Sequence, residues 1–394
     1  MRFNYFALIL LFTAVSALAA GCSPAITPGL PDEIPIGCVM PLTSTPSWGP
    51  NLVNAAKQAV DELNAGGGID GKKIVLLVAD EGPTPASAAM AVHELVDGKK
   101  VQVILGGTTS EAVVAAGPYC AGKNIPLVSP SATSTLISQQ GWSRWVFRIS
   151  PSDALQGGVV AKLIKDGGYK RVATLVQDTI YGRGIEEMAK EFLKGRTNVV
   201  MSLRYDPKKL SYRSELNAIK NENPDCVLCA GYYDDTAEVY KQAAELGLDN
   251  IKWIATDGSY DMPLDKYLAT AKFMEKAVTG TVPMSDTQSE VYQNFSKNYQ
   301  VMYNTAPTVY CDTSYDGLNL IARAIQLANT YDGGSIRDAL MKAGTDFHGA
   351  SGAITFDDRG SRMAGTYAVW KVEMQGTQYR FALTGQVITF LKPR

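Results

Sequence analysis

The chain has 394 residues, of which 46% are hydrophobic and 19% charged, and its 37 basic and 39 acidic side chains give a formal net charge of −2. This length is enough for two or three domains with cores of their own. The balanced charge excludes a basic surface for nucleic acid or an anionic membrane, and the ordinary hydrophobic content with only six cysteines excludes collagen-like, disordered and disulfide-rich proteins.

The first 21 residues have the pattern of a signal peptide. Residues 6–20 are almost entirely apolar, follow one basic residue, Arg2, and are fewer than the roughly 20 residues needed to span a bilayer. Small residues then lead into Cys22, a pattern that resembles the lipobox of bacterial lipoproteins, in which the cysteine carries the lipid. We expect cleavage before Cys22, lipidation of Cys22 and a tether over residues 22–31. The alternative is an ordinary signal peptide with an incidental cysteine.

Export from the cytoplasm permits disulfide bonds. If Cys22 carries a lipid, five cysteines remain, an odd number, so at least one is free or pairs outside the chain. They are Cys38, Cys120, Cys226, Cys229 and Cys311. Because no second run of about 18 apolar residues follows, we expect a soluble body in the periplasm or on the cell surface, which contacts the membrane through its lipid alone.

Residues 34–129 alternate strand and helix patterns. Short apolar, β-branched runs predict buried strands, and apolar residues at helical spacing predict helices between them. The strands are expected at 34–40, 73–79, 101–106 and 126–129, and the helices at 52–63, 85–96 and 110–121. Strands separated by single helices favour a parallel sheet covered on both faces.

A second series of the same kind follows residues 148–151. After a helix from Asp153, strands are expected at 172–177, 199–205, 226–230 and 251–255, with helices at 184–193, 211–221 and 235–246. The last third is mixed, with a helix around 317–328 and strand patterns at 353–356, 366–373 and 379–383. The sequence therefore predicts an α/β protein with two doubly wound parallel-sheet lobes.

Motifs for catalysis, metals and cofactors are missing or lie in the wrong context. The G-x-G-x-x-G pattern at 66–71 follows a helix and opens a strand, the reverse of a dinucleotide site, and indicates a helix-ending turn. Cys226 and Cys229 lie three apart in a predicted strand, so they point to opposite faces. His93 and His348 have no metal-site spacing, and no G-x-S-x-G elbow occurs. We expect no catalytic residues, metal or cofactor.

A set of polar and aromatic residues comes just after predicted strands, where open parallel sheets bind their ligands. Its members are Ser110, Ser131, Ala132, Thr133, Tyr181, Tyr232 and Asp257. Each has an ordinary role in loops or caps, but two sheets facing each other would bring them into one cleft. The first lobe would offer hydroxyl and backbone donors, and the second would offer tyrosines and a carboxylate. Such a set suits a zwitterion.

Several stretches carry a resemblance to a known family. Residues 59–73 read AVDELNAGGGIDGKK, residues 129–133 read SPSAT and residues 152–157 read SDALQG. Residues 181–184 read YGRG and residues 231–233 read GYY. Together they resemble the type I periplasmic binding proteins of branched-chain amino acid uptake systems, over nearly all of the mature chain. That resemblance implies two lobes joined by a three-crossover hinge.

The resemblance also implies roles for the polar set. The ligand's α-carboxylate would be held by Ser110 and the pair Ala132 and Thr133, with hydroxyls and backbone groups. The matching tyrosines of the second lobe are Tyr181 and Tyr232. Asp257 stands where the family has a Glu that holds the α-ammonium, and Trp48 stands where the family has an aromatic residue over the ligand side chain.

Besides Asp257, two further features depart from the family pattern. A disulfide of the type protein has no counterpart, because Thr109 stands at one cysteine position and residues 80–82 lack the other. Glu111 beside Ser110 is unusual. If it points inward it would favour a ligand with a polar or cationic side chain; the alternative is a solvated acid in the first turn of a helix.

The resemblance implies that the protein captures an amino acid, branched-chain or related, by closing two lobes, and delivers it to an ABC permease. We expect lobe 1 at residues 32–150 plus 283–355 and lobe 2 at 151–282 plus 356–394. Crossovers are expected near 149–152, 278–283 and 356–359. The alternatives are a sensory protein that presents its ligand to a signalling system and an exported hydrolase.

Overall fold

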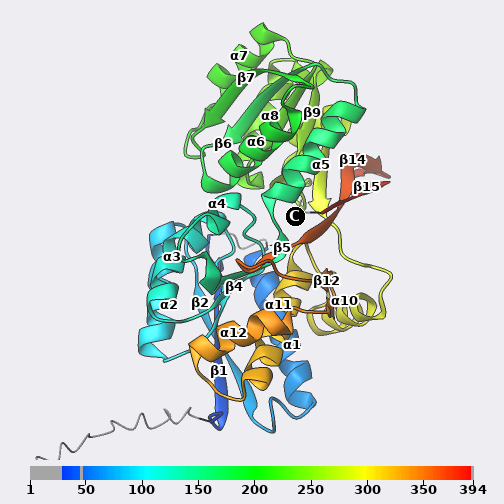
Figure 1. The fold of residues 1–394 in the computed structure, drawn as a ribbon. Coiled ribbons are helices and arrows are strands. Elements are labelled where there is room, and N and C mark those ends of the chain that lie inside the picture. The colour runs from blue at the N-terminus through cyan, green and yellow to red at the C-terminus, as the bar shows by residue number, and fades with distance from the viewer. Residues whose placement is uncertain (1–28, 45–47, 392–394) are drawn as a thin grey trace, which may run out of the picture.

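The computed structural model describes residues 29–44 and 48–391. The predicted signal peptide and Cys22 lie outside these residues. The two α/β units of the described chain are stacked end to end, one built on each of two large sheets (Figure 1). Within residues 29–44 and 48–391, no helix is both long and apolar enough to cross a membrane.

The first sheet has six strands in the order β13-β5-β4-β3-β1-β2, all paired in parallel. The strands are β1 (Glu33–Met40), β2 (Lys73–Asp80), β3 (Ile104–Gly106), β4 (Leu127–Ser129), β5 (Val146–Pro151) and β13 (Ser361–Arg362). One face packs on α1 (Gly49–Ala65), α11 (Cys311–Ala328) and α12 (Gly333–Ala343). The other face packs on α2 (Pro85–His93) and α3 (Ser110–Gly122).

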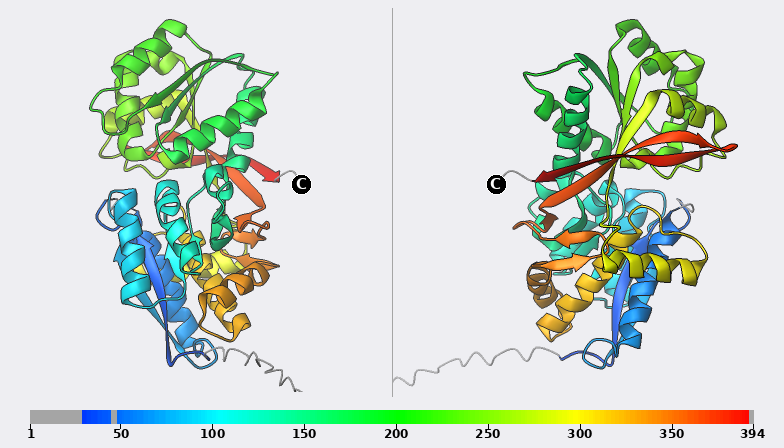
Figure 2. Two further views of the ribbon diagram at one scale, coloured as in Figure 1. Left: turned by 60° about the vertical axis from the view of Figure 1, so that its left-hand side comes forward. Right: turned by 90° about the vertical axis from the view of Figure 1, so that its right-hand side faces the viewer.

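The second sheet has seven strands in the order β15-β14-β10-β9-β8-β6-β7. They are β6 (Arg171–Gln177), β7 (Asn198–Tyr205), β8 (Cys226–Ala230), β9 (Lys252–Ala255), β10 (Val278–Pro283), β14 (Ala364–Gln375) and β15 (Gln378–Leu391). Strands β14 and β15 are antiparallel to their neighbours and the others are parallel. This long pair crosses the end of the upper unit beside the boundary with the lower one (Figure 2).

Helices cover both faces of the second sheet. One face packs on α5 (Asp153–Asp166) and α6 (Ile180–Leu193). The other packs on α7 (Arg213–Glu222), α8 (Tyr233–Glu245) and α9 (Leu268–Ala277). Because side chains alternate along β8, Cys226 packs on the face covered by α5 and α6, and Cys229 packs on the face covered by α7, α8 and α9. This confirms that the two side chains point to opposite faces.

All five cysteines of the described residues are free and buried: Cys38, Cys120, Cys226, Cys229 and Cys311. The glycine run after α1 is a turn, as predicted. Gly67 and Gly68 have φ of 102° and 72°, and a Cβ on Gly68 would lie 2.0 Å from the carbonyl oxygen of Lys72. Glycine is therefore required where α1 ends and the chain turns into β2.

The chain passes between the two sheets three times, after β5, after β10 and between β13 and β14. The third passage lies beyond Arg362, later than the expected crossover at 356–359. The reason is that β13 is the edge strand of the first sheet, where Arg362 donates to the carbonyl oxygens of Ile149, Ser351 and Ala353.

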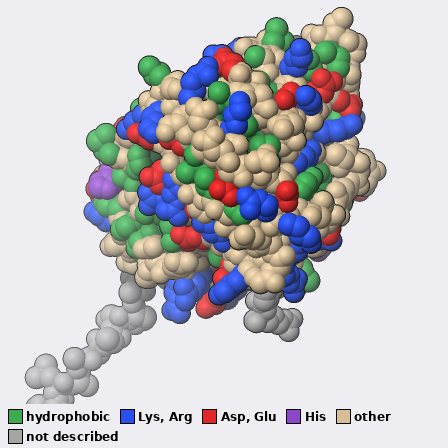
Figure 3. Space-filling model, turned by 90° about the horizontal axis from the view of Figure 1, so that it is seen from above, with side chains coloured by type: hydrophobic (Ala, Val, Ile, Leu, Met, Phe, Trp, Pro, Cys, Tyr) green, Lys and Arg blue, Asp and Glu red, His purple; other side chains and the backbone are tan. Residues whose placement is uncertain are grey.

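The remaining elements complete the first unit. Helix α10 (Glu290–Tyr303) packs on α1, α4 (Thr135–Ser138) follows β4, and β11 (Phe347–Gly349) pairs with β12 (Gly352–Ile354). On the face seen from above, basic and acidic side chains are interspersed (Figure 3). This mixture fits the balanced charge of the sequence.

Candidate functional site

The predicted site residues meet where the carboxyl ends of strands from the two sheets face each other. Strands β3 and β4 end just before Ser110 and Ser131, and β6, β8 and β9 end just before Tyr181, Tyr232 and Asp257. One hydrogen bond links the two units directly: the Tyr310 hydroxyl at the start of α11 donates to Asp257 Oδ2 at 2.6 Å. The fold thus brings the two predicted halves together.

The half on the first sheet is a set of loops held by hydroxyl groups. Ser131 donates to the carbonyl oxygen of Thr108 at 2.8 Å, and Ser129 donates to that of Gly107 at 2.5 Å. The Ser110 hydroxyl accepts from the backbone N–H of Ser134 at 3.2 Å. Ser110, Ala132 and Thr133 are all buried. These bonds tie the end of β3 to the end of β4.

Arg148 supports the same loops from beneath. Its side chain is 1% exposed, and its guanidinium donates to the carbonyl oxygens of Thr133 and Ser134, each at 2.8 Å. It also donates to the hydroxyls of Ser138 and Ser361. Burial lowers the pKa of Arg148 to about 10. This cation therefore positions the loops, with its donors directed at protein acceptors.

Glu81 joins two loops at the place where this chain lacks the disulfide of the type protein. It is 3% exposed, and its carboxylate accepts from the backbone N–H and the hydroxyl of Thr108 at 2.8–2.9 Å. Thr109 also bonds to it, and burial raises the pKa of Glu81 to about 7. The turn after β2 is thereby tied to the loop that leads into Ser110.

Asp257 is the centre of the half on the second sheet. It is 7% exposed, and its carboxylate accepts from the hydroxyl of Tyr310 and, at 3.0 Å, from that of Tyr181. The Tyr181 hydroxyl lies 2.7 Å from that of Thr256, which completes a short chain. Burial raises the pKa of Asp257, and the tyrosine hydroxyls oppose that rise. The carboxylate has no basic side chain among these partners.

Aromatic side chains lie at the boundary between the units. Tyr181 and Tyr232 stack with ring centroids 5.2 Å apart. Trp48, which precedes α1, packs against the core of each unit, and so does Val309. The predicted aromatic residues therefore lie at the boundary between the units, where closure would bury an apolar ligand group.

Glu111 differs from both of its sequence interpretations. It is half-buried, and its Oε1 accepts from the backbone N–H groups of Ile180 and Tyr181 at 2.5 and 3.2 Å. Since these two residues begin α6, the carboxylate of the first unit caps a helix of the second. It is neither a solvated acid nor a group left to contact a ligand.

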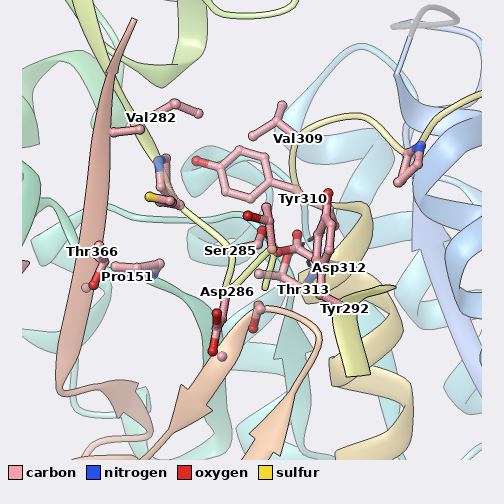
Figure 4. A pocket seen from close by; sticks show the side chains of 18 of the residues that line it. Pro151, Val282, Ser285, Asp286, Tyr292, Val309, Tyr310, Asp312, Thr313 and Thr366 are labelled. Carbon is pink, nitrogen blue, oxygen red and sulfur yellow. Dashed lines mark hydrogen bonds between the residues drawn. The ribbon is translucent and has the colours of Figure 1, made fainter. Parts of the chain in front are cut away.

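A cavity of about 620 Å³ is lined by Tyr310 but not by Asp257. It is lined by parts of all three passages, among them Pro151, Val282 and Thr366, and by Ser285 and Asp312. Figure 4 shows Ser285 and Asp312 close together near Tyr310, with Pro151 and Thr366 opposite. None of the eight predicted site residues lines it. Tyr310 separates this cavity from Asp257.

Three residues of the arrangement were not predicted as part of the site: Tyr310, Glu81 and Arg148. Tyr310 has a φ of 66° and follows a stretch with no strand pattern, so nothing in its neighbourhood marks it. In the sequence Arg148 marks only the segment between the two series of strands and helices, with no sign of a role in the site. Within the described part of the chain, no group of three or more His, Cys, Asp or Glu could hold a metal ion.

Comparison with known proteins adds the following. A family model described as periplasmic binding protein matches residues 33–378. The Leu/Ile/Val-binding protein BraC3 of Rhizobium johnstonii is 26% identical over 359 residues, which cover 89% of this chain and 95% of that protein.

Two solved structures are similar over most of the chain. The branched-chain amino acid transporter substrate-binding protein LivJ of Streptococcus pneumoniae, in complex with isoleucine, has 26% identity and a TM-score of 0.77, covering 91% of this chain and 99% of that chain. A solute-binding protein of an ABC transporter from Rhodopseudomonas palustris, in complex with 3,4-dihydroxybenzoic acid, has 23% identity and a TM-score of 0.76, covering 92% and 99%. The second likeness concerns the fold alone.

Proposed function

Because the chain belongs to the periplasmic binding protein family, we propose that it captures a free amino acid, branched-chain or related, between its two lobes and delivers it to the permease of an ABC transporter. The family binds solutes and its named relatives are binding proteins, which removes the hydrolase alternative. The proposed ligand contacts are Trp48, Ser110, Ser131, Ala132, Thr133, Tyr181, Tyr232 and Asp257, with Tyr310 added from the structure.

The observation that carries the proposal is the buried carboxylate of Asp257. It lies at the boundary between the lobes, and its partners are the hydroxyls of Tyr310 and Tyr181 and the side chain of Gln156, none of which is basic. A buried anion of this kind is stabilised by a cation brought in by the ligand. The hydroxyl-rich ends of β3 and β4 lie opposite and suit a carboxylate. An α-amino acid carries both groups on one carbon.

This reasoning also separates amino acids from aromatic acids. An aromatic acid such as the ligand of the Rhodopseudomonas protein has no ammonium group. It would leave Asp257 without a counter-charge and would add a second anion to the same cleft. The isoleucine of the Streptococcus complex is therefore the better guide to the ligand class.

The test is a ligand screen. Purified mature protein is melted in the presence of each common amino acid and of benzoate and 3,4-dihydroxybenzoate, and hits are titrated by calorimetry. We expect a rise in melting temperature with at least one aliphatic amino acid and none with the aromatic acids. Binding of an aromatic acid alone would overturn the amino acid assignment.

The lobes of the proposal follow the two sheets. The first comprises residues 32–151 and the segment from the end of β10 to Arg362, and the second comprises the remainder up to Leu391. Closure around three passages is a hinge motion, in which a few residues at element ends change their backbone angles. The polar groups of the two lobes then reach one small ligand at the same time.

We also propose that Cys22 is lipidated and anchors the body outside the cytoplasmic membrane, in the periplasm or at the cell surface. The support is the run of small residues that ends in Cys22 and the tether that follows. Mass spectrometry of the protein purified from its membrane fraction should find the mature N-terminus at Cys22 with attached acyl chains. An unmodified Cys22, or a start elsewhere, would contradict this.

A further inference from the structure

We propose that Glu111 is a closure latch: a carboxylate on one lobe that caps a helix on the other and thereby sets how long the cleft stays closed, whichever ligand it holds. This inference rests on the proposed function, because it concerns the same cleft. It assigns to Glu111 a contact between lobes, distinct from the contacts with the ligand.

The first argument is the hydrogen bonding of the α6 N-terminus. The first N–H groups of a helix have no partner within the helix. In α6 the Thr179 hydroxyl accepts from Gly182 N–H at 3.2 Å, whereas Ile180 and Tyr181 donate to Glu111. The cap of this helix is therefore completed by a side chain from the other lobe. When the lobes part, both N–H groups and the carboxylate return to water.

The second argument is electrostatic. A carboxylate at a helix N-terminus interacts favourably with the helix dipole, and its bonds to N–H groups are charge-assisted. Arg183 of the same helix bonds to Asp178 at 2.7 Å, and its charge also attracts Glu111 across the boundary. Glu111 thus contributes its charge to the helix end, and that contribution exists only while the lobes are in contact.

The third argument is the close fit around this contact. Ser134 of the first lobe donates to the carbonyl oxygen of Ile180 at 3.1 Å. Gly184 lies one turn further along α6, where a Cβ would be 2.9 Å from Ser134 Oγ and 3.0 Å from Asp153 Oδ2. A glycine at this position allows the helix to approach close enough for Glu111 to reach its end.

The consequence follows from the coupling between closure and affinity. If a ligand binds tightly only to the closed form, its apparent affinity is proportional to the population of that form. A latch that favours the closed form therefore raises the affinity for every ligand by the same factor. Most of the effect appears in the dissociation rate, because the latch has to break before the ligand leaves.

The first experiment compares Glu111→Ala and Glu111→Gln with the wild type, using the best three ligands of the screen. Glu111→Ala should weaken all three by about tenfold, mostly by faster dissociation in stopped-flow measurements. Glu111→Gln should fall in between, because its amide oxygen still accepts from N–H groups without a charge. Glu187→Gln, which removes an exposed acid of α6, is the control and should match the wild type.

Gly184→Ala breaks the latch without changing any charge and should cause a similar loss, since its Cβ would contact Ser134 Oγ. Thermal melts verify that each variant folds. Unchanged affinities for Glu111→Ala would overturn the latch. A loss confined to one ligand would also overturn it and would make Glu111 a direct ligand contact.

The second experiment needs no ligand. Spin labels on Met90→Cys in lobe 1 and Leu210→Cys in lobe 2 report the distance between the lobes; both positions are exposed, and the five cysteines of the described chain are buried. Glu111→Ala should shift the distance distribution relative to the wild type by depleting the short-distance population. An identical distribution would refute the latch. A wild type that binds no amino acid would refute the proposed function, while this measurement still decides the latch.

Discussion

Asp257 and Glu81 are both buried carboxylates, and their neighbours determine what each can do. Asp257 faces the opposite lobe and has hydroxyl partners from Tyr181 and Tyr310. Glu81 faces inward and has the N–H and hydroxyl of Thr108. The first is placed to meet a cation from outside, whereas the second holds a loop. Under the proposed function, a buried carboxylate thus serves binding at Asp257, whereas at Glu81 it positions a loop.

Asp257→Ala should weaken binding of the preferred amino acid by at least about thirtyfold. Removing one member of a buried, hydrogen-bonded charge pair typically costs about 2–5 kcal/mol, and about 1.4 kcal/mol corresponds to a factor of ten. Titration calorimetry measures the loss, and Asp265→Ala, at an exposed position of the same segment, is the control. The melting temperature of the ligand-free variant should stay close to that of the wild type. Burial raises the pKa of Asp257, so its charge does not stabilise the ligand-free fold. Undiminished affinity would remove the amino acid assignment.

Glu81 makes the stability of the protein depend on pH. Its pKa is raised by burial from an ordinary value of 4.5 to about 7, so the folded chain keeps a proton that the unfolded chain releases. Between pH 4.5 and 7 this group therefore lowers the free energy of unfolding as the pH rises, by up to about 3 kcal/mol. Below pH 4.5 the penalty is absent.

Glu81→Gln should remove this dependence. The neutral amide keeps an oxygen that can accept from Thr108, so the variant should gain stability relative to the wild type as the pH is raised from 4.5 to 8. Urea unfolding of both proteins at several pH values measures the difference, in which the other titrating groups cancel. A difference that does not vary with pH would show that Glu81 titrates normally in the fold.

Seven of the eight predicted site residues are recognisable from the sequence because each follows a strand whose apolar pattern is clear, whereas Trp48 was assigned from the family resemblance alone. Their supporting residues are not. Arg148 and Glu81 act through hydrogen bonds to loops that lie near them only in the fold. Glu111 was noticed for its position, but its partners at Ile180 and Tyr181 are about seventy residues away in the chain. Local pattern does not encode such pairs.

Strand β10 shows how an element can be stabilised by a partner far along the chain. It lies inside the second sheet between β9 and β14, and its Gly280 packs against Trp370 of β14. The indole is fully buried, and its N–H donates to the carbonyl oxygen of Thr281 at 3.2 Å. The ring is thus fixed on the strand that carries one of the three passages.

Gly280→Ala should destabilise the protein by about 1–3 kcal/mol, the usual range for an added methyl group in a packed core. A Cβ at this position would lie 2.2 Å from Trp370 Cζ2, and the bonded ring cannot move away freely. Chemical unfolding measures the change. Gly122→Ala at the end of α3, where nothing lies within 4 Å, is the control and should be neutral or slightly stabilising. Equal stability of the two variants would contradict this packing argument.

The elements that could be predicted from the sequence are those whose own residues are apolar enough to indicate burial. Strand β8, with five buried residues, was predicted to the residue. Strand β10, with the sequence VTGTVP, was expected only as a crossover implied by the resemblance, and its glycine and proline leave it without a clear strand pattern. Helix α10 was not predicted, because half of its residues are polar and only Phe295 and Tyr299 are buried. These elements owe their place to tertiary partners.

At the scale of the whole molecule, the proposed ligand site is inaccessible while the lobes touch. Ser110 is 1% exposed, Thr133 2% and Tyr181 2%. A ligand that contacts all three can enter only if the lobes separate first. The bonds Tyr310 to Asp257 and Glu111 to α6 cross the boundary, so both must break in the process.

Saturating amino acid should therefore reduce the radius of gyration measured by small-angle scattering. The ligand-bound profile should match the described structure, and the ligand-free profile should be more extended, because a ligand shifts the equilibrium toward the form that it binds better. The Asp257→Ala variant at the same ligand concentration should keep the ligand-free profile. Identical profiles of the wild type with and without ligand would exclude closure by a hinge.

The interleaved course of the chain has a consequence for biosynthesis. Strand β13 pairs with β5, although Ser361 lies 213 residues after Arg148. In the second sheet, β10 pairs with β14, which comes much later in the chain. Neither sheet is finished until almost the entire polypeptide has left the ribosome. Contacts of such long range form slowly. If the predicted signal peptide directs export, a chain of this topology would therefore still be unfolded when it enters the export channel and would fold on the far side.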